Sequence, residues 1–110
     1  MGFVHYGKRF MSCSIARQAR PSFETGGQWN AQSQEKARAY DSYLSYWGEY
    51  EVSGDVVIHH VRSSLFPNWE GGVQRRTARL TGSRLDLSAR LEEGSSQART
   101  AVLVWEREPD

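Results

Sequence analysis

The sequence predicts an all-β protein with one helix, namely a small antiparallel up-and-down β-barrel of about seven strands. Apolar and polar residues alternate with a period of two through most of the chain, as they do in half-buried strands. Short turn signals separate these stretches, so successive strands can pair as hairpins. One stretch, residues 31–45, instead spaces its apolar side chains as a helix does. An open sheet packed on that helix is the alternative.

The N-terminal part of the chain predicts one hairpin and a long loop. Residues 2–6 and 10–15 are typical of short strands, and the charged segment 7–9 makes the turn between them. Residues 17–30 contain Pro21 and two adjacent glycines and show no sustained period, so we expect a loop there.

Residues 31–45 form the stretch with a helical pattern. Asn30 is a suitable N-cap, and Ala37, Tyr40 and Leu44 recur at a spacing of about 3.6 residues. Charged and amide side chains occupy the opposite side of this helix. We therefore expect it to lie across one end of the barrel with its tyrosines turned inward.

Five further strands are predicted after the helix, at residues 46–52, 56–63, 73–80, 84–91 and 98–107. Turns or loops are expected between them, at residues 53–55, 67–72, 81–83 and 92–97. A sheet of hairpins with one apolar face curls, and its closure removes the exposed edges. A barrel of about eight strands is wide enough to hold side chains or one small ligand.

The composition limits the class of protein. A chain of 110 residues, 38% apolar and 25% charged, is typical of one globular domain spanning residues 1–110. The net charge is +1 with both signs interspersed, which argues against a nucleic-acid partner. We see no leader segment and no apolar run of about 18 residues, so we expect a cytoplasmic protein without a membrane partner.

Metal ions and cofactors are not expected. The single cysteine, Cys13, excludes an internal disulfide and a cysteine-based metal cluster, and its apolar neighbours favour a packed thiol. Three histidines, His5, His59 and His60, could in principle form a metal site, but His59 and His60 are adjacent and face opposite sides of a strand, so we do not expect one. No glycine-rich phosphate loop or nucleophile elbow is present.

Aromatic residues are numerous for so small a chain. Four Trp, five Tyr and four Phe occur among 110 residues. Aromatic side chains give large contact areas, and Tyr and Trp add a polar tip that needs a partner when buried. Either they fill the core, or they line a pocket.

Alternation along two strands sends one histidine and one arginine into the same interior. Arg62 must reach water, which turns His59 to the opposite, inward face. On strand 73–80, Leu80 suits the interior, and residues of the same parity, Gln74 and Arg76, follow it inward. A buried arginine stays charged and must be paired or hydrogen-bonded.

Two interpretations of these interior residues remain open. In the structural one, Arg76 extends to a barrel mouth and His59 bonds a backbone carbonyl or a tyrosine hydroxyl. In the functional one, Arg76 receives a carboxylate, enolate or other oxyanion while His59 acts as acid or base. Tyr50 or Tyr6 would then donate a hydroxyl hydrogen, and the catalytic set would be His59, Arg76 and Tyr50.

A ligand inside the barrel would also meet residues outside this set. Asn68 and Trp69 lie where the chain reverses and are expected to plug or rim the barrel. Glu49 and Glu70 are the carboxylates that could pair with Arg76. The predicted ligand-binding residues are Tyr6, Met11, Tyr40, Tyr46, Tyr50, His59, Asn68, Trp69, Gln74, Arg76 and Trp105.

Several segments together resemble a known family. They are "YLSYWGEYEV", "VVIHHVRSSLFPNWEGGVQRR", "LTGSRLDLS" and "TAVLVWER", with "GFVHY" and "FMSCSIARQARPSF" before them. This pattern resembles the lipocalin-like domain family of bacteria and fungi, often found near secondary-metabolite genes. The resemblance implies a calycin-type barrel with an interior cavity, usually without an assigned reaction. Against that pattern, the chain lacks the usual first strand.

The resemblance and the residues together give three hypotheses. The first is a module that binds a small, mostly apolar or aromatic molecule with an anionic or carbonyl end. The second is a cofactor-free isomerase or cyclase acting on a polyketide-like intermediate, and the third is a structural or partner-binding domain. Without the first strand, segments 2–6 and 98–107 either pair or expose open edges, and we expect a homodimer through one of them.

Overall fold

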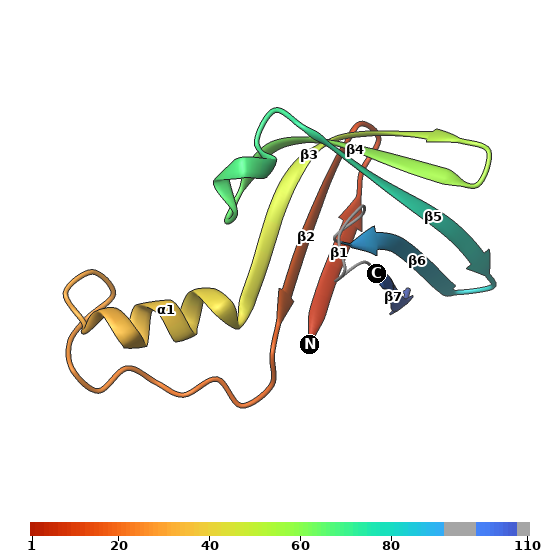
Figure 1. Ribbon diagram of the computed structural model, residues 1–110. Coiled ribbons are helices and arrows are strands. Elements are labelled where there is room, and N and C mark those ends of the chain that lie inside the picture. The colour runs from red at the N-terminus through yellow and green to blue at the C-terminus, as the bar shows by residue number, and fades with distance from the viewer. Residues whose placement is uncertain (92–98, 108–110) are drawn as a thin grey trace.

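The computed structural model describes residues 1–91 and 99–107, so the predicted loop at 92–97 lies outside the described residues. Seven antiparallel strands follow one another in sequence order through a single sheet that curls into a nearly closed barrel (Figure 1). The strands are β1 (Gly2–Tyr6), β2 (Phe10–Ala16), β3 (Tyr43–Ser53), β4 (Val56–Ser64), β5 (Val73–Thr81), β6 (Arg84–Leu91) and β7 (Arg99–Glu106). Helix α1 (Ser33–Asp41) lies between β2 and β3, and a 3-10 turn, η1 (Pro67–Trp69), lies between β4 and β5. The predicted fold class is confirmed.

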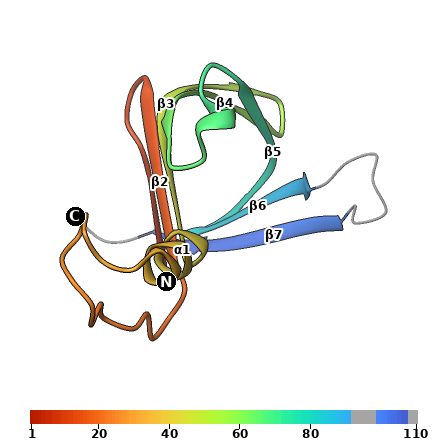
Figure 2. The same ribbon diagram turned by 60° about the vertical axis from the view of Figure 1, so that its left-hand side comes forward.

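The barrel has a seam between its first and last strands. β1 and β7 end the strand order, and no ladder joins them among the described residues. Figure 2 shows β6 and β7 curving round toward the N-terminal end of β1. A Cβ atom added to Gly2 would lie 3.0 Å from the ring of Trp105, so this indole lies against β1. At this point side-chain packing, rather than backbone pairing, spans the seam.

The alternation predicted for β4 is confirmed. Val57, His59 and Val61 are buried, whereas the intervening His60 and Arg62 are exposed. On β5 it holds for Gln74 and Arg76, which are half-buried, but the inward position predicted for Leu80 is wrong, because this side chain near the end of the strand is 72% exposed. The inward side chains of β2 and β3 join this core, with Met11, Cys13, Tyr46 and Val61 forming one packed cluster. The inward face of β5 is only half-buried, so the interior is tightly packed on one side and more open on the other.

Gly48 makes a close approach between β3 and β4 possible. The register of these strands shifts between Trp47 and Gly48, which is a β-bulge. A Cβ atom at Gly48 would lie 1.9 Å from the carbonyl oxygen of His60, a distance that no side chain tolerates. Glycine at this position therefore permits the close approach of the β3 backbone to the β4 backbone at the bulge, where Arg62 of β4 is the extra residue.

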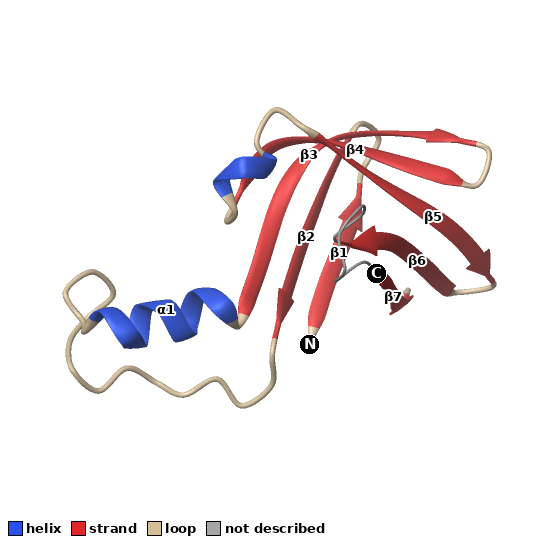
Figure 3. Ribbon diagram, viewed as in Figure 1, coloured by secondary structure: helices blue, strands red, loops and turns tan. Residues whose placement is uncertain are grey.

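The helix differs from its prediction in length and in its buried face. It spans Ser33–Asp41 instead of 31–45, because Tyr43 and Leu44 already belong to β3. Its C-terminal end joins β3 at one end of the barrel, and the rest of the helix extends sideways, away from the barrel (Figures 1 and 3). The prediction that the helix turns its tyrosines inward is wrong, because the Tyr40 side chain is 44% exposed.

The long loop before the helix explains this difference. The buried helix residue is Glu35, whose carboxylate accepts hydrogen bonds from the backbone N–H groups of Glu24 and Thr25 at 2.9 and 3.2 Å. The predicted N-cap, Asn30, instead accepts from the N–H of Gly27 at 2.7 Å, and Gln32 occupies the cap position. The helix is therefore held by its own loop.

Candidate functional site

The barrel interior contains a histidine held between two tyrosines. The Nε2 atom of His59 lies 2.7 Å from the Tyr6 hydroxyl, and its Nδ1 atom lies 2.7 Å from the Tyr46 hydroxyl. The three side chains come from β4, β1 and β3 and meet although they are far apart in sequence. His59 is 1% exposed, so both of its ring nitrogens depend on these two phenols.

The strand register explains how these side chains meet. Tyr50 stands directly opposite His59, and Tyr6 is paired through Met11 to Gly48 in one row across the sheet. The Tyr6 ring packs edge-on against the Tyr50 ring, with 4.8 Å between the ring centroids.

Burial keeps the three groups uncharged at neutral pH. Desolvation and the nearby charge of Arg76 lower the pKa of His59 from 6.5 to about 4. Desolvation raises the pKa of Tyr46 to about 12, although the nearby charge of Arg76 opposes this shift. Burial also raises the pKa of the Tyr6 phenol. The cluster is therefore a neutral network with a guanidinium beside it.

Arg76 is half-buried and has no carboxylate partner among the described residues. It stands opposite Val57 on the inward face of β5, diagonal to His59. Its Nη2 atom donates to the Gln74 Oε1 atom at 3.3 Å, and its Nη1 atom donates to the backbone carbonyl of Arg75 at 3.1 Å. Both acceptors are neutral, so the positive charge of Arg76 has no counter-ion among the described residues.

The two carboxylates considered as partners for Arg76 bind elsewhere. Glu49 is on the outer surface, where it pairs with Arg9 at 2.9 Å and with Arg62. Glu70 accepts a hydrogen bond from the backbone N–H of Ser64 at 3.2 Å. Neither of these two possible pairings forms, because strand parity turns Glu49 outward and Glu70 bonds back to the end of β4.

The other polar groups that face the interior are mainly donors. The indole N–H of Trp105 is buried without a hydrogen-bond partner among residues 1–91 and 99–107. Burial raises the pKa of the Cys13 thiol to about 11, so it stays protonated. In that same part of the chain, no three His, Cys, Asp or Glu side chains gather as a metal site would require. The interior can offer hydrogen bonds to a molecule that carries acceptor atoms.

The structure brings most of the predicted ligand-binding residues together. Those packed in or against the core are Tyr6, Met11, Tyr46, Tyr50, His59, Trp69 and Trp105, with Gln74 and Arg76 on the half-buried wall. Trp69 packs edge-on against the Tyr46 ring, with 5.7 Å between centroids. Two residues lie apart: Asn68 is exposed in η1, and Tyr40 is on the outer helix.

The structural interpretation predicted that His59 bonds a backbone carbonyl or a tyrosine hydroxyl, and the structure shows tyrosine hydroxyls at both of its nitrogens, from Tyr6 and Tyr46. Tyr50 and Tyr6 were the predicted hydroxyl donors to a ligand. Of these, Tyr50 donates its hydroxyl to the backbone carbonyl of Gly7. The part played by Tyr46 was missed, although its shared strand face with Tyr50 is the signal that points to it.

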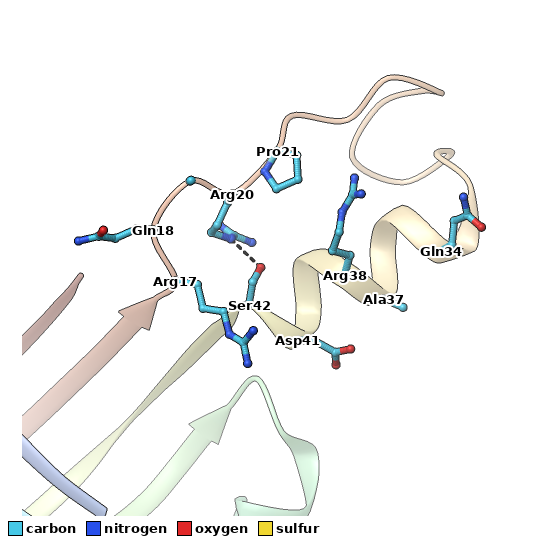
Figure 4. A pocket seen from close by; sticks show the side chains of 10 residues that line it. Arg17, Gln18, Arg20, Pro21, Gln34, Ala37, Arg38, Asp41 and Ser42 are labelled. Carbon is cyan, nitrogen blue, oxygen red and sulfur yellow. Dashed lines mark hydrogen bonds between the residues drawn. The ribbon is translucent and has the colours of Figure 1, made fainter.

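Two hollows lie outside the barrel, beside the helix. One, of about 540 Å³, is lined by Arg17, Arg20 and Arg38 together with Asp41, and Figure 4 shows Arg20 turned to Ser42. The other, of about 700 Å³, is an aromatic groove that includes Trp29 and Tyr40. The loop at 17–30 forms part of both, and since that loop has no period, sequence reasoning did not find them.

The curled antiparallel sheet, its aromatic interior and its end helix define a lipocalin-like barrel. The chain belongs to the lipocalin-like domain family, whose model matches residues 1–108. It is similar to the 4'-hydroxy-3'-methoxypropiophenone carrier protein ppsC of Aspergillus oryzae, with 34% identity over 86 residues, covering 71% of this chain and 78% of the relative. No solved structure shows a significant match. Within the described ranges, no helix has the length and apolarity needed to span a membrane.

Proposed function

We propose that the protein is a carrier that holds one small aromatic molecule inside the barrel, with a carbonyl or anionic oxygen directed toward Arg76. The observation that carries this proposal is the interior guanidinium with two neutral acceptors and no carboxylate among the described residues. A half-buried charge of this kind is stabilised by a counter-charge or a strong acceptor. A ligand carboxylate, phenolate or carbonyl would supply one.

The family and the named relative support the same class of ligand. The relative is named as the carrier of a compound with an aromatic ring, a carbonyl and a hydroxyl group. Aromatic side chains around Tyr6, Tyr50 and Trp105 offer stacking and edge contacts for such a ring. We therefore take 4'-hydroxy-3'-methoxypropiophenone as the first test ligand and a secondary-metabolite intermediate as the natural class.

Isothermal titration calorimetry with this ketone tests the proposal. Hydrogen bonds to charged groups contribute about 1.5–3 kcal/mol, so Arg76→Met should weaken binding by roughly 10- to 100-fold. Arg75→Met is the matched control, because the neighbouring side chain is exposed on the other strand face. Absence of binding to the wild-type protein, or equal binding by the Arg76→Met variant, would contradict a carrier that uses Arg76.

The remaining functional expectations stay predictions. The isomerase or cyclase alternative requires His59 to exchange protons, yet both of its nitrogens already contact phenols, so a substrate would reach it only through Tyr6 or Tyr46. The structural-domain alternative and the cytoplasmic location are likewise untested.

We further propose that two copies associate through the open edges of the sheet. Support comes from β1 and β7, which have no ladder between them among the described residues and so present unpaired backbone groups. Pairing with a second copy would satisfy these groups, and two-fold dimers are the commonest soluble assembly. Light scattering should then report twice the 12.5 kDa mass of the chain. A mass of one chain at micromolar concentration would count against the dimer.

A further inference from the structure

We propose that the hydrogen bonds through His59 run in one direction, from Tyr46 to Tyr6, and that the Tyr6 hydroxyl is the donor that selects ligands carrying an acceptor oxygen. In this arrangement Tyr46 donates to Nδ1 of His59, and the Nε2–H of His59 donates to the oxygen of Tyr6. The hydrogen of Tyr6 is then available to the ligand. This inference rests on the proposed carrier function and names a specificity-determining residue for it.

The protonation state of His59 allows only two directions. A neutral imidazole has one N–H donor and one acceptor nitrogen. Because both nitrogens lie 2.7 Å from a phenol oxygen, one phenol must donate to the ring and the other must accept from it. The phenol that accepts keeps its own hydrogen for a further partner. The question is whether that phenol is Tyr6 or Tyr46.

Arg76 favours donation by Tyr46. Among the described residues, the hydrogen-bond partner of the buried Tyr46 hydroxyl is Nδ1 of His59, so its hydrogen is satisfied only if Tyr46 donates to that nitrogen. The positive charge of Arg76, which acts on the Tyr46 hydroxyl, favours the same direction because it attracts the oxygen and repels the hydrogen. The opposite direction would leave the Tyr46 hydrogen beside a positive charge, on a side chain that is only 4% exposed. A buried hydroxyl hydrogen without an acceptor is costly.

The accessibility of the two phenols agrees with this direction. Tyr6 is half-buried, whereas Tyr46 is buried, so the Tyr6 end of the network is the one that another molecule can reach. His59 is the hydrogen-bond partner that the structure gives the Tyr6 hydroxyl. The ring of Tyr6 is held by its edge-on contact with Tyr50, and this contact fixes the direction in which the Tyr6 hydroxyl points.

The expected ligand class follows from two neighbouring donors. Tyr6 would offer a neutral O–H and Arg76 a charged N–H, and no carboxylate among the described residues pairs with either. Aromatic ketones, phenolates and aryl carboxylates supply acceptor oxygens for both. Aromatic hydrocarbons would leave both donors unpaired, and aryl ammonium ions would be repelled by Arg76.

Nitrogen-15 NMR of labelled protein tests the direction without any ligand. Neutral His59 should show the Nε2–H tautomer, with Nδ1 resonating as an unprotonated nitrogen that accepts a hydrogen bond. The Nδ1–H tautomer would overturn the inference, because Tyr46 would then be the acceptor and Tyr6 the donor to the ring.

Binding measurements with Tyr6→Phe test the selection. The probes are 4'-hydroxy-3'-methoxypropiophenone, 2-methoxy-4-propylphenol, which lacks the carbonyl, and 3'-methoxypropiophenone, which lacks the hydroxyl. The wild-type protein should bind the first probe about 2- to 12-fold more tightly than at least one of the other two, as expected for one neutral hydrogen bond. Tyr6→Phe should lose that preference. Tyr50→Phe, whose hydroxyl contacts Gly7 instead, should retain it.

The outcomes separate this inference from the carrier function. If the wild-type protein binds the first probe and Tyr6→Phe keeps every preference, the inference is wrong while the carrier function stands. If the wild-type protein binds none of the three probes, the proposed function itself fails for this ligand class.

Discussion

His59 should make the stability of the fold strongly dependent on pH. In the unfolded chain a histidine titrates near 6.5, whereas burial and Arg76 lower the pKa of His59 in the fold to about 4. As the pH falls below 6.5 the unfolded chain takes up a proton that the folded chain does not. The stability that His59 contributes is therefore fully present above pH 6.5 and is lost progressively as the pH falls, until it levels off below about 4.

The size of this effect follows from the two pKa values. A difference of one pKa unit corresponds to about 1.36 kcal/mol, so lowering the pH from about 7.5 to about 4.5 should cost roughly 2.5 kcal/mol. The value can be applied with little discount for solvent because His59 is 1% exposed. Glu35 and Glu49 also have lowered pKa values, but the stability they contribute is lost only below about pH 4.5.

Urea unfolding across this pH range measures the effect. His59→Gln, which remains neutral, should lose most of the wild-type pH dependence between about pH 7.5 and 4.5. His60→Gln makes the same change at an exposed neighbour and should keep the wild-type dependence. If the free energy of unfolding of His59→Gln falls with pH as steeply as that of the wild-type protein, the neutral, buried state assigned to His59 is wrong.

Two further changes test other parts of the structure. Gly48→Ala places a Cβ atom 1.9 Å from the His60 carbonyl and should destabilise the fold by at least about 3 kcal/mol, whereas Gly7→Ala meets its nearest atom at 3.4 Å and should cost far less in the same urea titration. Equal losses would contradict the close approach at the bulge. Cys13, buried with a pKa of about 11, should react with iodoacetamide only as fast as the protein unfolds, and labelling of the folded protein at the rate of a free thiol would disprove its burial.

The strands and the inward residues could be predicted from the sequence because alternation and turn signals are local. Arg62 must face water, and that single requirement orients His59 correctly on the same strand. The partners of His59 depend instead on how three strands curl, which is a property of the whole sheet. The spacing therefore indicated a polar interior but did not distinguish Tyr46 from Tyr50.

The helix shows where local reasoning fails. Its apolar spacing predicted contact with the barrel, but Glu35 is the side chain it buries, against the loop before it. That loop is held by individual hydrogen bonds, such as the one from the Gly27 N–H to the Asn30 side chain, and such bonds leave no periodic pattern in the sequence. The hollows lined by this loop were unpredictable for the same reason.

The location of the bound ligand tests the central claim most directly, and the four indole N–H groups can report it. Trp105 and Trp69 pack against the barrel core, whereas Trp29, 80% exposed, lines the aromatic groove beside the helix, and Trp47 is on the outer surface. In an NMR titration with 4'-hydroxy-3'-methoxypropiophenone, the indole signals of Trp105 and Trp69 should shift and those of Trp29 and Trp47 should not. Shifts at Trp29 with Trp105 and Trp69 unchanged would place the ligand in the outer groove and contradict an interior carrier site.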